Sequence, residues 1–382
     1  MTIGLEPGSD VRGMIATAPI PAGALLIHTP GNLVLPISGD ACQHVQAIIN
    51  EIRLGDQSKW QPYFEFDGTA GSHVPTQWDR SNGPGRAMNE LQGLPPAGDT
   101  HRHVDWYQRA CNENEGKDLS DIEERAFLMI LTRAADIGLV PMYDLMNHHN
   151  GKINTRLERD GDGGLKVIAS VDISTGTPIY ITYARAGMES TVDVFNTYGF
   201  VDDFPQLFRW STDDLVRLSE EDKDHAQRRY GMVNSEANTQ PAHRPHFEPN
   251  THHYEVLVVS PTLAALAPTK QLVQILGNGQ RTLEEWEMLI RSHHANLRFS
   301  HAMVLHDSAK AILDGLPTTI EEDEVILPDE KRRLAKARRA GRVDLNKADA
   351  IRAIEFRLAF KKALWMSVEV AEGGVFLEDR EL

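Results

Sequence analysis

Cysteine is almost absent from this sequence: Cys42 and Cys111 are the two present in 382 residues. Two cysteines cannot supply a four-cysteine zinc site or the disulfide framework of a small secreted domain. Long apolar stretches are missing as well, because no run reaches the roughly 18 residues that span a membrane. The first residues carry neither a basic flank nor an apolar segment. We therefore expect no signal peptide and no membrane association, and we expect the protein in the cytosol or the nucleus.

Basic charge is also in deficit, since the formal net charge is −16. Phosphate binding needs a dominant basic surface, so we expect no nucleic-acid partner. Residues 331–342 hold seven basic residues in twelve, but they follow the acidic run Glu321 to Glu324. A solvated helix face explains this stretch. No metal is expected either, because ligand-type spacing is missing from the one loop rich in histidine, at His243, His246, His252 and His253.

Hydrophobic residues make up 41% of the chain and charged residues 25%, as in ordinary soluble globular proteins. The length leaves room for two domains. Local signals predict several elements: short strands on both sides of a turn at 21–23, a helix capped by Asp40 and running to about Leu54, and a hairpin over 153–168. The capping box Ser120 to Glu123 predicts a helix that stops near 132–133.

The most informative segment is Val140 to Gly151. Its apolar approach ends abruptly in Asn-His-His-Asn-Gly, and Asn and Gly favour turns, so we expect a buried strand or turn that delivers polar groups to a site. About thirty residues later, 178–183 alternates like a strand and ends at Tyr183. A polar, helix-like run then ends in Tyr198-Gly199-Phe200.

These three motifs, in this order, resemble those of SET-domain protein methyltransferases, in the subgroup of the Rubisco large-subunit and actin-histidine methyltransferases. The sequence around Trp60 to Tyr63, the segment 318–324 and an amphipathic helix over about 346–364 are similar to that subgroup too. The resemblance implies an α+β protein. Its β-rich SET domain would span 1–203 with a helical insert at about 40–120, and an all-α substrate-binding domain would span 204–382. We expect a monomer that acts on a non-histone protein, since the zinc-binding cysteines of many histone-directed members are missing.

By the same resemblance, S-adenosyl-L-methionine is the cofactor and Tyr183 is the catalytic tyrosine. Asn147 and His148 would meet the cofactor largely through their backbone, and Asp144 would support their turn. The implied cofactor-binding set is Arg133, Asp144, Asn147, His148, Tyr183, Ser190 and Tyr198, and the implied substrate pocket is Ala135, Tyr143 and Tyr198. Each residue also has a structural interpretation, because Tyr183 and Tyr198 fit core aromatics and His148 fits a turn histidine.

Three departures from the family pattern stand out. Val11 replaces the first glycine of a cofactor loop, and Thr191 replaces an asparagine that faces the cofactor. Ala135 stands where lysine-modifying members carry an aromatic residue, and the run from Asn147 to Gly151 shares the N-H-x-N-G form of the histidine-modifying members. The acceptor therefore stays open between lysine and histidine. The alternative function is a catalytically inactive SET-like module that binds protein partners.

Overall fold

The structure is a computed structural model that describes residues 1–6, 12–36, 40–67, 74–78, 83–91, 107–108, 110–111, 119–183, 189–211, 253–260, 263–268, 285, 288, 306, 309–341 and 345–369. Val11 and the histidines 243, 246 and 252 lie outside these ranges. The chain divides into two compact units. Unit 1 comprises Met1–Ser72 and Val104–Arg185, and unit 2 comprises His73–His103 and Ala186–Leu382. This division assigns the middle of the predicted insert, and residues 186–203, to unit 2; the domain limits 1–203 and 204–382 stay a prediction.

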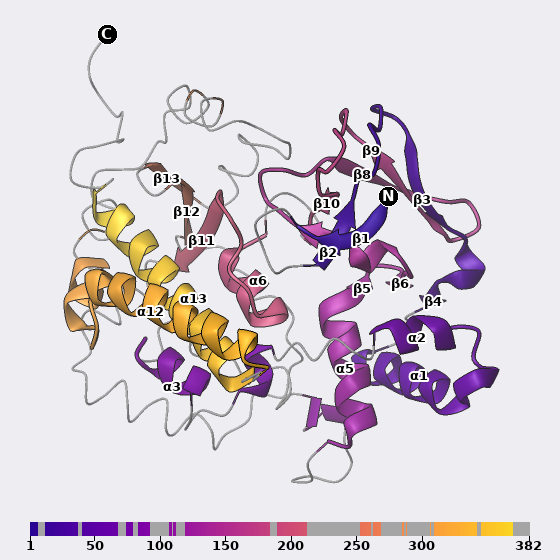
Figure 1. The fold of residues 1–382 in the computed structure, drawn as a ribbon, viewed down its shortest axis with the longest axis horizontal. Helices are drawn as coiled ribbons and strands as arrows, with labels where there is room; N and C mark the ends of the chain where they lie inside the picture. The colour runs from indigo at the N-terminus through magenta and orange to yellow at the C-terminus, as the bar shows by residue number, and fades with distance from the viewer. Residues whose placement is uncertain are drawn as a thin grey trace. The chain divides into compact units, whose positions relative to one another are not determined.

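Unit 1 contains short strands in four small sheets (Figure 1). β1 (Thr2–Leu5) pairs with β2 (Arg12–Ile15), and β7 (Asn147–His148) runs parallel to β10 (Tyr180–Ile181). The two three-stranded sheets have the orders β3-β9-β8 and β4-β6-β5, with β3 (Leu25–Thr29), β9 (Leu165–Ala169), β8 (Thr155–Arg159), β4 (Leu35–Pro36), β6 (Gly138–Leu139) and β5 (Ala134–Ala135). The predicted hairpin is confirmed as β8 and β9. The two strands expected around the turn at 21–23 are also present, but each pairs with a different partner.

The helices of unit 1 begin where local chemistry predicts. They are α1 (Ala41–Leu54), α2 (Gln61–Asp67) and α5 (Asp121–Arg133), with short 3-10 turns η1 (Gly31–Leu33), η2 (Gly55–Gln57) and η5 (Tyr143–Leu145). The Asp40 carboxylate accepts the Gln43 N–H at 2.9 Å, which satisfies one of the free donors at the start of α1. The predicted capping box at Ser120 is formed as well. Apolar side chains of these helices form one buried cluster that includes Ile48, Phe64 and Phe127.

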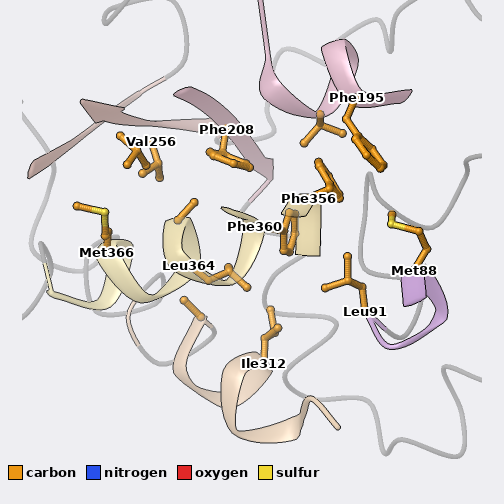
Figure 2. Close-up of a cluster of buried hydrophobic side chains, with 14 of the residues drawn as sticks. Met88, Leu91, Phe195, Phe208, Val256, Ile312, Phe356, Phe360, Leu364 and Met366 are labelled. Atoms are coloured by element: carbon orange, nitrogen blue, oxygen red, sulfur yellow. The ribbon is translucent and has the colours of Figure 1, made fainter. Parts of the chain in front are cut away.

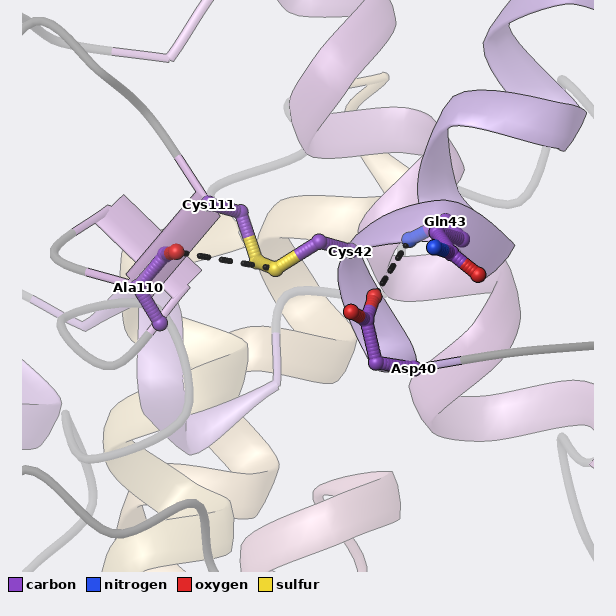
Figure 3. Close-up of a disulfide and its surroundings, with 5 residues drawn as sticks. All are labelled: Asp40, Cys42, Gln43, Ala110 and Cys111. Atoms are coloured by element: carbon purple, nitrogen blue, oxygen red, sulfur yellow. Dashed lines mark hydrogen bonds between the residues drawn. A yellow bond between two sulfur atoms is a disulfide. The ribbon is translucent and has the colours of Figure 1, made fainter.

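A disulfide joins Cys42, in the first turn of α1, to Cys111, with their Cα atoms 5.2 Å apart (Figure 3). Sequence reasoning considered these cysteines too few for a zinc site or a disulfide framework and did not predict that they pair. Their separation of 69 residues explains the omission, because spacing alone gives no signal for a single long-range pair.

Unit 2 combines helices with a sheet. Its elements are η3 (Pro75–Gln77), α3 (Gly83–Asn89), α6 (Thr191–Tyr198), β11 (Gln206–Ser211), β12 (His253–Ser260), β13 (Leu263–Pro268), α12 (Ile320–Arg339) and α13 (Leu345–Glu369). The α+β class is confirmed, but the all-α expectation for residues 204–382 is corrected, because the three strands form an antiparallel sheet in the order β11-β12-β13. The apolar and β-branched run Val256 to Val259 in β12 favours a strand.

The core of unit 2 brings together residues far apart in the sequence. Met88 and Leu91, from the predicted insert, pack with Phe195 of α6 and with Phe356 and Phe360 of α13 (Figure 2). The rings of Phe195 and Phe356 stack with their centroids 4.0 Å apart. The insert thus supplies part of the C-terminal core. Among the residues described, no helix is long and apolar enough to cross a membrane.

A group of charged side chains is buried beside this core. Asp323 of α12 is 0% exposed and accepts hydrogen bonds from Arg357 Nε at 2.9 Å and Lys361 Nζ at 2.7 Å, both from α13. Lys361 also donates to the Thr318 carbonyl at 2.7 Å, and Arg357 pairs with Glu90 just beyond α3. The two cations and two carboxylates balance one another. They connect α12, α13 and the end of the insert.

Candidate active site

The segment from Val140 to Gly151 contains the turn η5 and, after it, the short strand β7. Asn147 pairs with Tyr180 and His148 with Ile181, across the parallel ladder to β10. Strand β10 leads directly to Tyr183, two residues beyond Ile181. Residues paired in register project to the same face of a sheet, so the Asn147 and Tyr180 side chains lie on one face. The local order of the chain therefore brings the Asn-His pair and the tyrosine together.

His148 and Tyr183 contact one another in two ways. Their rings stack with centroids 5.2 Å apart, and the Tyr183 N–H donates to His148 Nδ1 at 3.1 Å. Because Nδ1 accepts, the proton of the neutral ring lies on Nε2. Burial, followed by the neighbouring His149, lowers the pKa of His148 to about 3, while the Asn150 side chain acts in the opposite direction. The ring is therefore neutral at any physiological pH.

The Tyr183 hydroxyl is held by the main chain. It donates to the Met146 carbonyl at 3.2 Å. Burial raises the pKa of Tyr183 above its ordinary value, while Arg133 acts to lower it. The hydroxyl therefore stays protonated near neutral pH. It can present a dipole to a reacting group but cannot serve as a general base there.

Asp144 and Arg133 support the turn that precedes β7. The Asp144 side chain is 2% exposed, and Arg133 Nη1 lies 3.4 Å from its Oδ2 and 3.3 Å from its backbone oxygen. The Tyr63 hydroxyl, from α2 in the insert, donates to the same Oδ2 at 2.5 Å. A buried carboxylate needs such partners to remain charged. Asp144 is thus held by residues of α2 and α5, and the Trp60 to Tyr63 motif has a polar role as well as a packing one.

The residues expected to line the substrate pocket in unit 1 lie around one small apolar cluster. Ala135 and Tyr143 both pack against Val34, Val140 and Leu165. Burial, with smaller effects of Asp136 and Asp144, raises the pKa of Tyr143 to about 12. Its ring is therefore a neutral wall at physiological pH. Met142, just before it, is exposed and has a φ of 73°, a conformation that is uncommon outside glycine.

Ser190 and Tyr198 belong to unit 2, at the two ends of α6. The Ser190 hydroxyl accepts the Val192 N–H at 3.3 Å and so caps the helix, and Gly199 ends it in the left-handed region with a φ of 75°. Thr191 is completely buried, and its hydroxyl accepts the Leu207 N–H at 3.2 Å. Thr191 therefore has a structural role in joining α6 to β11. Tyr198 packs near Phe200, with ring centroids 6.3 Å apart.

Sequence reasoning missed Glu6 entirely. Its Oε1 accepts from Asn147 Nδ2 at 2.6 Å, and its Oε2 accepts from the Tyr180 hydroxyl at 2.9 Å. One carboxylate thus connects two side chains that are paired across β7 and β10. No periodicity or motif marks Glu6, because the connection spans 141 residues to Asn147 and 174 to Tyr180.

Comparisons with known proteins identify a family model and two solved structures that this chain resembles. Residues 11–184 match the family model described as "SET domain". The fold is similar to "Structure of Rubisco LSMT bound to AdoMet", with 17% identity and a TM-score of 0.53, covering 97% of this chain and 87% of that chain. It is also similar to "Crystal structure of the SET domain of LSMT bound to Lysine and AdoHcy", with 16% identity, a TM-score of 0.50, and 97% and 86% coverage. No curated protein matches the chain significantly.

Proposed function

Because residues 11–184 match the SET-domain family model, we propose that the chain is an S-adenosylmethionine-dependent protein N-methyltransferase acting on a lysine or histidine side chain. The observation that carries the proposal is the contact between the Asn147-His148 strand and Tyr183. The structurally similar proteins support it, since one is bound to AdoMet and the other to lysine and AdoHcy.

The polar groups of the site fit this cofactor. Both hydrogens of the Asn147 amide are donated to oxygens, Glu6 Oε1 at 2.6 Å and the Arg12 carbonyl at 3.1 Å. The amide therefore offers an oxygen acceptor, which suits the ammonium group of the methionine half. We propose Asn147, His148 and Arg133 as the residues of unit 1 that would hold the cofactor.

When bound, S-adenosylmethionine supplies a methyl group on a positively charged sulfur, which a neutral nitrogen attacks in line. The chain's contribution is to align the reacting atoms and to surround them with fixed dipoles. Tyr183 provides one such dipole, because its protonated hydroxyl is anchored to the Met146 carbonyl. Tyr143 and Ala135 would shape the acceptor pocket. The small Ala135 side chain leaves room for a flat imidazole as well as for an extended amine.

We expect chelator-treated protein to bind S-adenosylmethionine, measured as heat in an isothermal titration. Asn147→Ala should weaken binding roughly tenfold or more, because it removes a hydrogen bond to a charged group. Asn50→Ala, on the exposed side of α1, is the matched control and should leave the affinity unchanged. Wild-type protein that releases no heat with excess cofactor would instead favour an inactive protein-binding module.

The pH dependence of the methylation rate identifies the acceptor. Between about pH 6 and 9, His148, Tyr143 and Tyr183 each keep one protonation state, because the pKa of His148 is about 3, that of Tyr143 is about 12 and that of Tyr183 is raised. A free lysine has a pKa of about 10.4 and a histidine of about 6.5. The rate should therefore rise through about pH 9 for a lysine acceptor and level off above roughly pH 7 to 8 for a histidine.

Rates at saturating cofactor, with the acceptor protein found by labelling a cognate proteome, provide this measurement. A bell-shaped profile centred near pH 7 would fit neither acceptor. It would show that a side chain of the protein gains or loses a catalytic proton in this range, against the pKa directions above.

We further propose a monomeric enzyme with a non-histone protein substrate and no membrane partner. The net charge of −16 argues against a nucleic-acid partner. The cytosol or nucleus is the proposed location. Disulfides are uncommon in these compartments, so the Cys42–Cys111 bond is unusual for a protein in this location. Thiol titration of protein isolated from its own cells tests whether the bond is formed there.

A further inference from the structure

Glu6, directly after β1, binds two side chains near the candidate active site, and neither contact is assigned a role in cofactor affinity by the proposed function. It is partly buried, and its two carboxylate oxygens bind two different residues of unit 1, Asn147 and Tyr180. Asn147 and Tyr180 are register partners on β7 and β10. The Glu6 carboxylate thus binds one side chain from each of the parallel strands β7 and β10, and it connects both strands to the segment that follows β1.

These bonds determine which way the Asn147 amide faces. The two groups next to its nitrogen, the Glu6 carboxylate and the Arg12 carbonyl, are both acceptors. Only the NH2 end of an amide can satisfy two acceptors, so the reversed orientation is excluded. Among the described residues no donor reaches the amide oxygen of Asn147, so this oxygen remains available to a ligand.

The backbone leaves space for this arrangement at Gly13. A Cβ atom at Gly13 would lie 2.5 Å from Asn147 Nδ2 and 3.1 Å from Glu6 Oε1. Both distances are shorter than ordinary contacts, so any larger side chain would push the amide and the carboxylate apart. Around this amide, Glu6 supplies a carboxylate and Arg12 supplies a carbonyl. Gly13 leaves open the space that a side chain would fill.

We propose that Glu6 is a positioning residue for the cofactor: it holds the Asn147 amide so that its oxygen faces the cofactor's ammonium group. This inference rests on the proposed function. Without Glu6 the Asn147 NH2 group keeps the weaker bond to the Arg12 carbonyl at 3.1 Å, so the amide is oriented less firmly and its oxygen is directed less often at the ammonium. The loss of Glu6 should therefore reduce the affinity for S-adenosylmethionine although Glu6 need not touch it.

Isothermal titration of the full chain with S-adenosylmethionine tests the inference. Glu6→Ala should bind about tenfold more weakly, since a hydrogen bond to a charged group is lost. Glu6→Gln should stay within about threefold of wild type, because its carbonyl still accepts from Asn147 while its NH2 group donates to the Tyr180 oxygen. Glu158→Ala, on β8 and paired with Arg156 on the surface, is the matched control and should bind like wild type.

A spectroscopic signature separates orientation from general destabilisation. In protein labelled with ¹⁵N-asparagine, the side-chain NH2 signal of Asn147, assigned by its absence in Asn147→Ala, should exchange slowly with solvent. Slow exchange should persist in Glu6→Gln and disappear in Glu6→Ala. A variant that merely unfolds would lose the other asparagine signals too.

The outcomes are distinct. If wild type binds and Glu6→Ala binds equally well, Glu6 does not position the cofactor and the inference is overturned while the proposed function stands. Equal weakening in Glu6→Gln and Glu6→Ala, with slow exchange kept in both, would overturn it as well, because charge and not orientation would matter. Wild-type protein that binds no cofactor would overturn the proposed function and this inference with it.

Discussion

Tyr183→Phe is expected to lower the turnover number roughly 10²- to 10³-fold, the size of effect seen when one fixed dipole at a reacting centre is removed. The change deletes a single oxygen and its hydrogen bond to the Met146 carbonyl. The stacking on His148 and the backbone hydrogen bond to its Nδ1 both survive. The affinity for S-adenosylmethionine should therefore change little, and the loss should appear in kcat rather than in KM for the cofactor.

Tyr107→Phe is the matched control for this variant. Its ring stacks on Phe127 in the separate helical core, with centroids 5.0 Å apart, so the same atomic change is made away from the site. Turnover is measured on the acceptor protein at saturating cofactor, and affinity by titration. Wild-type turnover in Tyr183→Phe would remove Tyr183 from the catalytic role.

Asp323→Ala is expected to destabilise the protein by about 3 to 5 kcal/mol, because it leaves buried cations without their carboxylate. Asp323 is completely buried between Arg357 and Lys361, and burial already lowers the pKa of Lys361. Removing the carboxylate leaves Arg357 paired with Glu90 but takes away the buried carboxylate that Lys361 contacts. The midpoint of urea unfolding of the full chain, followed by tryptophan fluorescence, measures the change.

Asp329→Ala on the same helix is the control. Asp329 pairs with Arg332 on the surface, and its side chain is 49% exposed. Exposed ion pairs contribute little, so its midpoint should differ from wild type by less than about 0.5 kcal/mol in free energy. If both variants unfold like wild type, the buried charges are dispensable for stability.

The parts of the fold that the sequence predicted are those governed by neighbouring residues. The Asp40 cap, the Ser120 capping box and the hairpin β8–β9 each depend on atoms within a few positions along the chain. Local signals of this kind are legible in one sequence. The contact between His148 and Tyr183 is different, because it joins residues 35 positions apart and was expected from the resemblance of the motifs to those of a known family.

The parts that could not be predicted depend on long-range pairing. The contacts of Glu6 with Asn147, of Tyr63 with Asp144 and of Cys42 with Cys111 each join segments far apart in the chain. The sheet of unit 2 was missed for a related reason. Its strands β11 and β12 are separated by about forty residues. Their strand conformation depends on pairing with one another, which local sequence does not reveal.

The Cys42–Cys111 bond turns part of the chain into a closed covalent ring. That ring includes His73–His103, the residues of the insert that belong to unit 2 and whose Met88 and Leu91 pack against α13. A single cut of the backbone anywhere between the two cysteines would therefore release nothing. The protein would keep its full mass in a denaturing gel without reductant and would separate into two pieces only when the sulfur–sulfur bond is reduced, so that a nicked molecule stays one molecule.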